Sequence, residues 1–199
     1  MSAPVILASG SASRAAMLRD AGVPFTVETS RVDEGSIKAA MLAEDAPPRD
    51  IADKLAELKA QRVAARHPGA LVLGADQVLV CKGRLYDKPV DRAAAASQLH
   101  ALQGQTHELL SAAVLFEEAR PVWRQIGRAQ LVMRPLSDAF IQDYLDRVGE
   151  AVLGSVGAYH LEGLGAQLFT RVQGDYFSVL GLPLLDVLGV LRSRGVIGA

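Results

Sequence analysis

The stretch at residues 71–89, LVLGADQVLVCKGRLYDKP, is the part of the sequence that most constrains the fold. It begins with an apolar run of the kind that fills a strand buried on both faces of a sheet. Asp76 and Gln77 interrupt this run, and the apolar pattern resumes after them. A carboxylate directly after a buried strand is costly unless another group pairs with it. We therefore expect Asp76 to lie in a reactive cleft and Lys88, near the end of the stretch, to belong to the same site.

The composition describes an ordinary globular chain with a sizeable core. Half of the 199 residues are hydrophobic and the net charge is −1. This balance argues against disorder and against a protein that coats nucleic acid, which would be basic. Cys81 is the only cysteine, so the chain has no intramolecular disulfide and no cysteine-based zinc site. We expect Cys81 to be a small buried hydrophobe.

The sequence shows no targeting or membrane signal. The beginning, MSAPVILASGS, has no basic region, and its apolar run is too short for a signal peptide. No stretch is long enough to span a membrane. We expect a reducing, cytoplasmic setting, with neither a membrane nor a nucleic acid as partner.

A strand, a small polar loop and a helix are predicted at the N-terminus. Residues 5–8 form a short apolar run, Ser9 to Ser13 are small and polar, and the following residues favour a helix that Ser11 or Ser13 can cap. Such a loop exposes backbone N–H groups at a helix N-terminus, where an anion is favoured. Arg14 can add a bidentate phosphate contact. The alternative is that the serines only cap the helix and Arg14 is solvated, and these residues alone leave both open.

The next segment contains acidic and basic residues whose roles depend on what they face in the fold. Asp33 and Glu34 are adjacent acids in an expected loop, and they matter only if they face Asp76, where Mg²⁺ would want oxygen ligands. Asp50 is expected to cap a helix that runs to about residue 66. Three residues of this helix form an apolar stripe along one face. Lys54 and Lys59 lie off that stripe, so the residues alone predict that both lysines are solvated. The stripe consists of Ile51, Leu55 and Leu58.

The C-terminal half adds antiparallel strands. The patterns predict helices at 91–102, 138–148 and 184–194, the first two capped by Asp91 and Ser137, and strands at 106–116 and 121–133. The glycine-rich stretch 154–174 contains Tyr159 and Glu162 and is interpreted as a ligand-lining loop, the alternative being a packed tyrosine and an exposed glutamate. His107 is expected to be structural. Together these elements predict an α/β protein with a mixed, strongly bent sheet and one cleft.

Eight short motifs, taken in order, resemble those of one family, the Maf proteins. They are LASGSASRAAML, VDE, LAELKA, GADQVLV, DKP, GQTHELL, GAYHLEGLGAQLF and GDYFSVLGLPL, and the match covers nearly the whole chain, from about Val5 to Arg194. Maf proteins are cytoplasmic nucleoside triphosphate pyrophosphatases. The resemblance implies the fold of the inosine triphosphate pyrophosphatases, here one domain over residues 1–199 with two lobes around a central cleft.

The resemblance also implies a reaction, a cofactor and roles for individual residues. Maf proteins hydrolyse nucleoside triphosphates to the monophosphate and pyrophosphate with a divalent metal, usually Mg²⁺ with Mn²⁺ as an alternative, and they often form homodimers. The carried-over roles are a general base at Asp76, an acidic position at Glu34, a phosphate-binding loop at Ser9, Ser11 and Arg14, and catalytic lysines at Lys59 and Lys88. The chemistry leaves open whether Asp76 takes the proton of the water or holds the metal, which Glu34 could share.

Two positions bear on the substrate. The branch associated with 7-methyl-GTP typically has the glutamine and glutamate that stand here as Gln77 and Glu162, whereas the dTTP/UTP branch has threonine and glutamine. A glutamate suits the N1–H and 2-amino group of guanine. Ser13 matches neither branch, and the segments GAYHLEGLGAQLF and GDYFSV resemble the dTTP/UTP branch. We expect 7-methyl-GTP or a related modified nucleotide, with dTTP/UTP hydrolysis as the alternative.

Two alternative functions other than nucleotide hydrolysis remain. Maf proteins are associated with septum formation, so one is a nucleotide-binding regulator of cell division that does not require catalysis. The other is a nucleotidyltransferase, although the loop lacks the glycine-rich signature of that class.

Overall fold

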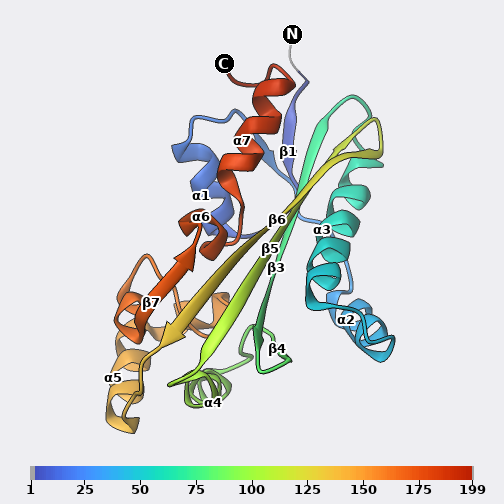
Figure 1. Cartoon of the computed structure of the whole chain (residues 1–199). Coiled ribbons are helices and arrows are strands. Elements are labelled where there is room, and N and C mark those ends of the chain that lie inside the picture. Colours follow the sequence, from blue (N-terminus) through green and yellow to red (C-terminus); the bar gives the residue numbers. More distant parts are fainter. Residues whose placement is uncertain (1–2, 199) are drawn as a thin grey trace.

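The computed structural model describes residues 3–198 and contains a seven-stranded mixed sheet with helices on both faces (Figure 1). This confirms the predicted α/β class with a mixed sheet. The strands are β1 (Val5–Leu7), β2 (Thr26–Val27), β3 (Leu71–Cys81), β4 (Arg84–Tyr86), β5 (Thr106–Glu117), β6 (Arg120–Met133) and β7 (Phe169–Gly174). The helices are α1 (Ala12–Asp20), α2 (Glu34–Ala43), α3 (Pro48–Ala64), α4 (Arg92–Leu102), α5 (Asp138–Val148), α6 (Tyr176–Val179) and α7 (Leu184–Ser193), with 3₁₀ turns η1 (Gly149–Gly154) and η2 (Leu164–Leu168).

The sheet joins a parallel part to an antiparallel part. The strand order is β2-β1-β3-β5-β6-β7, with β4 paired to β3. Strand β1 runs parallel to β2 and β3, whereas β3–β5, β5–β6, β6–β7 and β3–β4 are antiparallel. Strand β3 therefore belongs to both parts, and the long strands β3, β5 and β6 run side by side through the molecule (Figure 1).

One edge of β3 has an interrupted ladder. Strand β1 pairs with residues 71–73 of β3, and β4 pairs with residues 79–81. No strand pairs with the residues between them on this edge, although β5 pairs with the other edge from Val72 to Val80. Asp76 and Gln77 lie at this gap. The prediction that they interrupt the strand is therefore wrong: β3 is continuous, and only its pairing on one edge is interrupted.

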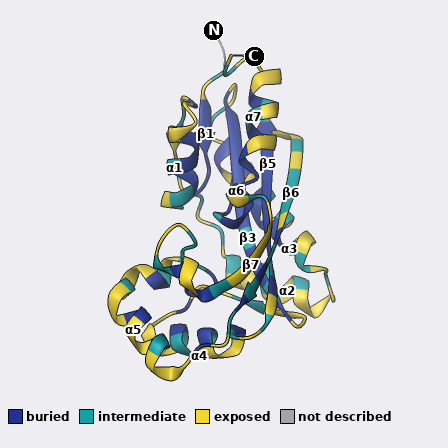
Figure 2. Cartoon of the chain, turned by 60° about the vertical axis from the view of Figure 1, so that its left-hand side comes forward, coloured by how far each residue is buried: buried dark blue, intermediate teal, exposed yellow. Residues whose placement is uncertain are grey.

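Three apolar clusters hold the helices to the sheet. Helix α3 packs on one face, α1 and α7 pack on the other face around Leu73 and Leu115, and α4 and α5 enclose a third cluster around Leu99 and Leu131. Buried residues concentrate along the central strands, and the outer faces of the helices are exposed (Figure 2). Gly74 allows β3 and α3 to approach closely, because a Cβ there would lie 2.1 Å from the carbonyl oxygen of Ala56.

Most predicted element boundaries hold, with exceptions between residues 33 and 66 and in the glycine-rich stretch. Residues 154–174 were interpreted as a loop, but the last six of them form strand β7, which pairs with β6. Ser11, Asp91 and Ser137 cap their helices as predicted. Helix α2 was not predicted, and the expected loop acid Asp33 is its N-cap. Pro47, and not Asp50, is the N-cap of α3.

Lys59 is also placed differently from the pattern-based expectation. The buried stripe of α3 runs through Ile51, Leu55, Lys59 and Val63 at intervals of four residues, so Lys59 lies on the stripe and is buried. Leu58, which was assigned to the stripe, is only half-buried. Among residues 3–198, no helix combines the length and the apolar character that a membrane span requires.

Candidate active site

A cleft of about 810 Å³ opens at the gap in the β3 ladder. All nine residues that the sequence analysis assigned to a site line this one cleft, as does Tyr159. They come from six parts of the chain: the β1–α1 connection and α1, α2, α3, β3, the segment after β4, and the glycine-rich stretch. The nine are Ser9, Ser11, Arg14, Glu34, Lys59, Asp76, Gln77, Lys88 and Glu162.

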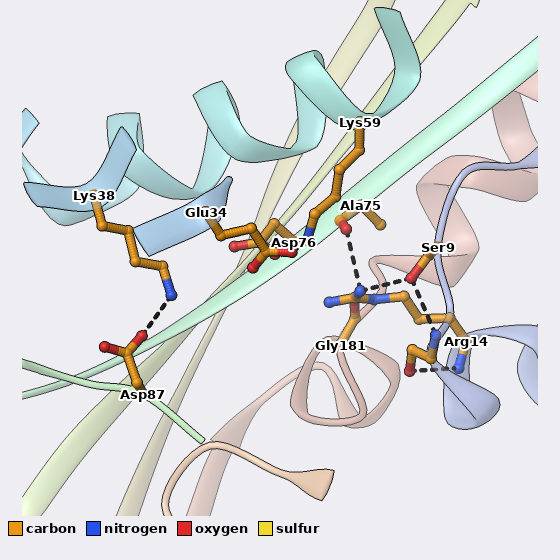
Figure 3. A network of polar contacts seen from close by, with 10 residues as sticks. Ser9, Arg14, Glu34, Lys38, Lys59, Ala75, Asp76, Asp87 and Gly181 are labelled. Carbon is orange, nitrogen blue, oxygen red and sulfur yellow. Dashed lines mark hydrogen bonds and ion pairs between the residues drawn. The ribbon is translucent and has the colours of Figure 1, made fainter. Parts of the chain in front are cut away.

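Lys59 joins two carboxylates at the centre of the cleft. Its Nζ donates to Asp76 Oδ1 at 2.5 Å and lies 2.8 Å from Glu34 Oε1 (Figure 3). The side chains of Lys59 and Asp76 are 10% and 7% exposed, whereas that of Glu34 is 43% exposed. The register places Asp76 on the α3 face of the sheet, since Val72 and Val78 of the same strand pack there. A buried lysine thus compensates the buried carboxylate that the sequence made conspicuous.

The second oxygen of Asp76 is left without a partner. Oδ2 is buried and accepts no hydrogen bond from any described residue. A buried carboxylate oxygen without a partner is unfavourable, so this position favours a water or a ligand that can bind it. Within residues 3–198 no group of three or more His, Cys, Asp or Glu side chains is arranged to hold a metal by itself. Asp76 and Glu34 nevertheless suit Mg²⁺, which commonly takes one or two carboxylates together with waters and substrate phosphates.

Arg14 links three elements and keeps one nitrogen for other contacts. It is buried, its Nε donates to the Gly181 carbonyl at 2.7 Å, and its Nη1 donates to Ser9 Oγ at 3.0 Å and to the Ala75 carbonyl at 3.1 Å (Figure 3). The contact with Ala75 occupies a carbonyl in the unpaired edge of β3. Burial lowers the pKa of Arg14, and the charges of Asp76 and Glu34 oppose this shift. Only Nη2 has no partner among the described residues, so the bidentate contact expected from the sequence reduces to this one nitrogen.

The serines of the first loop use their oxygens within the protein. Ser9 Oγ accepts from Arg14 and from the Ser11 backbone N–H, and Ser11 Oγ accepts from the backbone N–H of Arg14. A hydroxyl that accepts in this way still has its own proton to donate. The loop is therefore both the cap of α1 and a set of donors that faces the cleft.

Gln77 is held from its amide nitrogen. Nε2 donates to Ser111 Oγ at 2.9 Å and to the carbonyls of Ser178 and Val179 at 3.1 and 3.0 Å. These bonds connect β3 to α6, on the sheet face opposite to Asp76. The amide oxygen is therefore the part of Gln77 that remains for a ligand.

Two histidines support the glycine-rich wall of the cleft. His107 Nε2 lies 2.8 Å from Tyr159 Oη, both residues are buried, and burial lowers the pKa of His107 to about 4. This bears out the structural reading of His107. His160 Nδ1 lies 3.7 Å from Glu162 Oε1, and this contact raises the pKa of His160 and lowers that of Glu162. Glu162 thus faces the cleft as a carboxylate.

Apart from His160, the charges that line the cleft are balanced. Four cations, Arg14, Lys38, Lys59 and Lys88, stand against four carboxylates, Glu34, Asp76, Asp87 and Glu162. Lys88 is exposed and has no ion-pair partner among the described residues, whereas Lys38 pairs with Asp87. Pattern reading missed this second pair, although Lys38 lies four residues after Glu34 and therefore on the same face of a helix. Ser111 and Ser178, which anchor Gln77, carried no local signal.

Sequence comparisons agree with this geometry. A family model described as "Maf-like protein" matches residues 4–194. The chain belongs to the Maf family. It is 53% identical over 197 residues to a protein of Ruegeria pomeroyi named "Nucleoside triphosphate pyrophosphatase", with 99% of each chain covered. A protein of the same name from Paramagnetospirillum magneticum is 54% identical over 190 residues, which cover 96% of this chain and 98% of the relative. Another from Caulobacter vibrioides is 50% identical over 194 residues, which cover 98% of this chain and 97% of the relative.

Proposed function

We propose that this protein hydrolyses nucleoside triphosphates to the nucleoside monophosphate and pyrophosphate. The observation that carries the proposal is the buried Asp76–Lys59 pair, with Glu34 beside it, facing a serine and arginine loop across one cleft. The names of the Ruegeria and Paramagnetospirillum relatives support the same activity. Attack of water at the α-phosphorus needs three things from such a site: an oriented water, compensation of the phosphate charge and a stabilised leaving group.

Each of these tasks has a candidate residue. Asp76 takes the proton of the attacking water through Oδ2, the oxygen that has no partner in the protein. Lys59 fixes the Asp76 carboxylate by binding its other oxygen. Donors on the other side of the cleft, Arg14 Nη2 and the hydroxyls of Ser9 and Ser11, bind the phosphate chain, and Lys88 contacts the departing pyrophosphate as negative charge moves onto it.

A divalent cation fits between the carboxylates and the substrate. The lining charges balance, whereas a triphosphate carries about four negative charges near neutral pH. The cleft therefore lacks the positive charge that a triphosphate requires. Glu34 would hold Mg²⁺ or Mn²⁺ together with phosphate oxygens, and Asp76 would join it only if Oδ2 ligates the ion in place of acting as the base, because Oδ1 is bound to Lys59. When bound, the ion supplies charge compensation and lowers the pKa of a bound water.

For the base we propose a preference for 7-methyl-GTP or a related modified guanine nucleotide. Glu162 is an ionised acceptor at the glycine-rich wall, and it can receive hydrogen bonds from the N1–H and 2-amino group of guanine. Hydrolysis of dTTP and UTP is the alternative within the same family, because residues 157–169 and 174–179 resemble that branch, although a pyrimidine edge would suit an amide better than the carboxylate of Glu162.

The test of the reaction is a pyrophosphate-release screen over the common and the methylated nucleoside triphosphates, with Mg²⁺ and with Mn²⁺. We expect metal-dependent turnover of at least one substrate, and Asp76→Asn should lower kcat by at least about a hundredfold. If no triphosphate releases pyrophosphate with either metal, the proposal is wrong. Full activity of Asp76→Asn would remove Asp76 from the role of base.

The same screen with Glu162→Gln tests the base preference. We expect kcat/KM for methylated guanine nucleotides to fall relative to kcat/KM for dTTP and UTP, because the substitution replaces an acceptor-only group by an amide. An unchanged substrate profile would place Glu162 outside base recognition.

A further inference from the structure

Helix α2 brings a second lysine to the cleft. Lys38 lies one helical turn after Glu34, so the two side chains project from the same face of the helix. Figure 3 shows Glu34 directed toward Asp76 and Lys38 directed toward Asp87. The Lys38 side chain is 17% exposed, and its Nζ lies 2.5 Å from Asp87 Oδ1. No role for this pair follows from the reaction described above.

The Lys38–Asp87 pair connects two walls of the cleft, helix α2 and the segment after β4, and each wall is also anchored to other parts of the fold. Asp87 directly precedes Lys88, and its backbone carbonyl accepts a hydrogen bond of 2.8 Å from Gln98 Nε2 on α4. The main chain at Asp87 is therefore fixed from α4 and does not depend on Lys38. Helix α2 has its own attachments, since Ile37 and Met41 pack against the cluster around α3.

Asp87 is a partner that Lys38 can exchange. Its side chain is 70% exposed, and an ion pair with so exposed a member contributes little to stability. Burial lowers the pKa of Lys38, but the hydrogen bond and charge of Asp87, together with the charges of Asp76 and Glu34, outweigh burial and raise it. Lys38 is therefore an ammonium group close to the carboxylates at which the reaction would occur.

We propose that Lys38 is a substrate-binding residue: Asp87 holds its ammonium group in the free protein, and a bound polyphosphate replaces Asp87 as its partner. The inference rests on the proposed function, because it places the phosphate chain in this cleft. Lys59 is occupied by Asp76 and Glu34, so it has less freedom to bind phosphate. Among residues 3–198, Lys38 has one ion-pair partner, the exposed Asp87, and losing that partner leaves its full charge for the ligand.

The competing interpretation of the Lys38–Asp87 contact is a structural strut, an ion pair that only holds helix α2 in place. Helix α2 has no fully buried residue, so the Lys38–Asp87 pair could simply hold the helix in place. The two readings differ in one respect. A strut needs both members equally, whereas a cation that changes partners loses binding when Lys38 is removed and keeps or gains binding when the charge of Asp87 is removed.

The experiment compares Lys38→Met, Lys38→Arg and Asp87→Asn by calorimetric titration with inorganic tripolyphosphate in the presence of Mg²⁺. We expect Lys38→Met to weaken the Kd about tenfold, as for one charged hydrogen bond. Lys38→Arg should recover part of this loss, and Asp87→Asn should bind as tightly as the wild type or more tightly. Lys54→Met is the matched control, because Lys54 pairs with Glu57 on the outside of α3 and does not line the cleft.

Two other outcomes would contradict the proposal that a polyphosphate replaces Asp87 as the partner of Lys38. Equal weakening in Lys38→Met and Asp87→Asn would identify the pair as a strut, and unchanged binding in Lys38→Met would exclude Lys38 from the binding site. Pyrophosphate release by the wild type is measured in parallel and tests the proposed reaction by itself. A wild type that binds tripolyphosphate but hydrolyses no nucleotide would contradict the reaction, and the variants would still decide the role of Lys38.

Discussion

Lys59 is the residue on which the centre of the cleft depends. It satisfies one oxygen of Asp76 at a position where both side chains are nearly inaccessible to water. Lys59→Met would leave the Asp76 charge buried and unpaired, so we expect the free energy of unfolding to fall by about 3–5 kcal/mol. Urea unfolding at neutral pH measures this loss.

The control and the rescue separate charge from packing. Lys54→Met, on the exposed side of the same helix, should cost less than about 1 kcal/mol. Adding Asp76→Asn to Lys59→Met removes the unpaired charge and should restore most of the stability. Equal small losses in Lys59→Met and Lys54→Met would show that the Asp76–Lys59 pair does not carry this energy.

His107 makes stability depend on pH through its burial. In the folded protein the pKa of His107 is about 4, against 6.5 for an ordinary histidine, so the unfolded chain binds the proton first as the pH falls. Stability is therefore lost from about pH 6.5 downward, and His107 should account for about 2 kcal/mol between pH 7 and pH 5.

The measurement is the difference between wild type and His107→Gln, because the carboxylates of the protein titrate in both. Glutamine can still hydrogen-bond to Tyr159, so the variant retains the contact and loses the titration. We expect the unfolding free energy of His107→Gln to fall less steeply between pH 7 and pH 5. Parallel pH profiles of the two proteins would contradict the assignment.

At the scale of elements, the contact between β3 and α3 sets the distance from Asp76 to Lys59. A Cβ at Gly74 would lie 2.1 Å from the Ala56 carbonyl oxygen and 2.7 Å from the Ala60 nitrogen, and neither backbone atom can turn away. We expect Gly74→Ala to destabilise the protein by at least about 1–3 kcal/mol and to lower kcat as well, because separating the strand from the helix moves Lys59 from Asp76.

Gly189 in α7 provides the matched glycine. A Cβ there meets no atom within 4 Å, so Gly189→Ala should stabilise the protein by about 0.5–1 kcal/mol and leave kcat unchanged. Thermal unfolding and steady-state kinetics of the two variants test the comparison. A Gly74→Ala protein as stable and active as the wild type would show that the close approach is not required.

The elements also show which features local sequence can predict. Ser11, Asp91 and Ser137 were identified as caps because capping is a local rule. Helix α2 was not predicted although six of its ten residues are apolar, and none of its residues is fully buried in the fold. Lys59 was expected in solvent because a buried lysine requires Asp76, which lies far away in sequence and is brought near only by the fold.

At the scale of the whole molecule, the cleft arises where the parallel and antiparallel parts of the sheet meet. Strand β3 is paired on one edge and open on the other between residues 73 and 79, so side chains on both of its faces reach one cavity. Motif order predicted which residues share the cleft. It could not predict that Arg14 would donate hydrogen bonds from Nε and Nη1 to two backbone carbonyls and a serine hydroxyl, because these bonds follow from tertiary packing.

The central claim is hydrolysis at the α-phosphorus in this cleft, and isotope transfer from water tests it most directly. The protein is incubated with Mg²⁺ and a turned-over nucleoside triphosphate in water labelled with a heavy oxygen isotope, and the products are analysed by mass spectrometry. The account predicts one labelled oxygen in the nucleoside monophosphate, unlabelled pyrophosphate, and labelled monophosphate formed at least about a hundredfold more slowly by Asp76→Asn. Label in pyrophosphate or in inorganic phosphate, or unchanged labelling by Asp76→Asn, would contradict it.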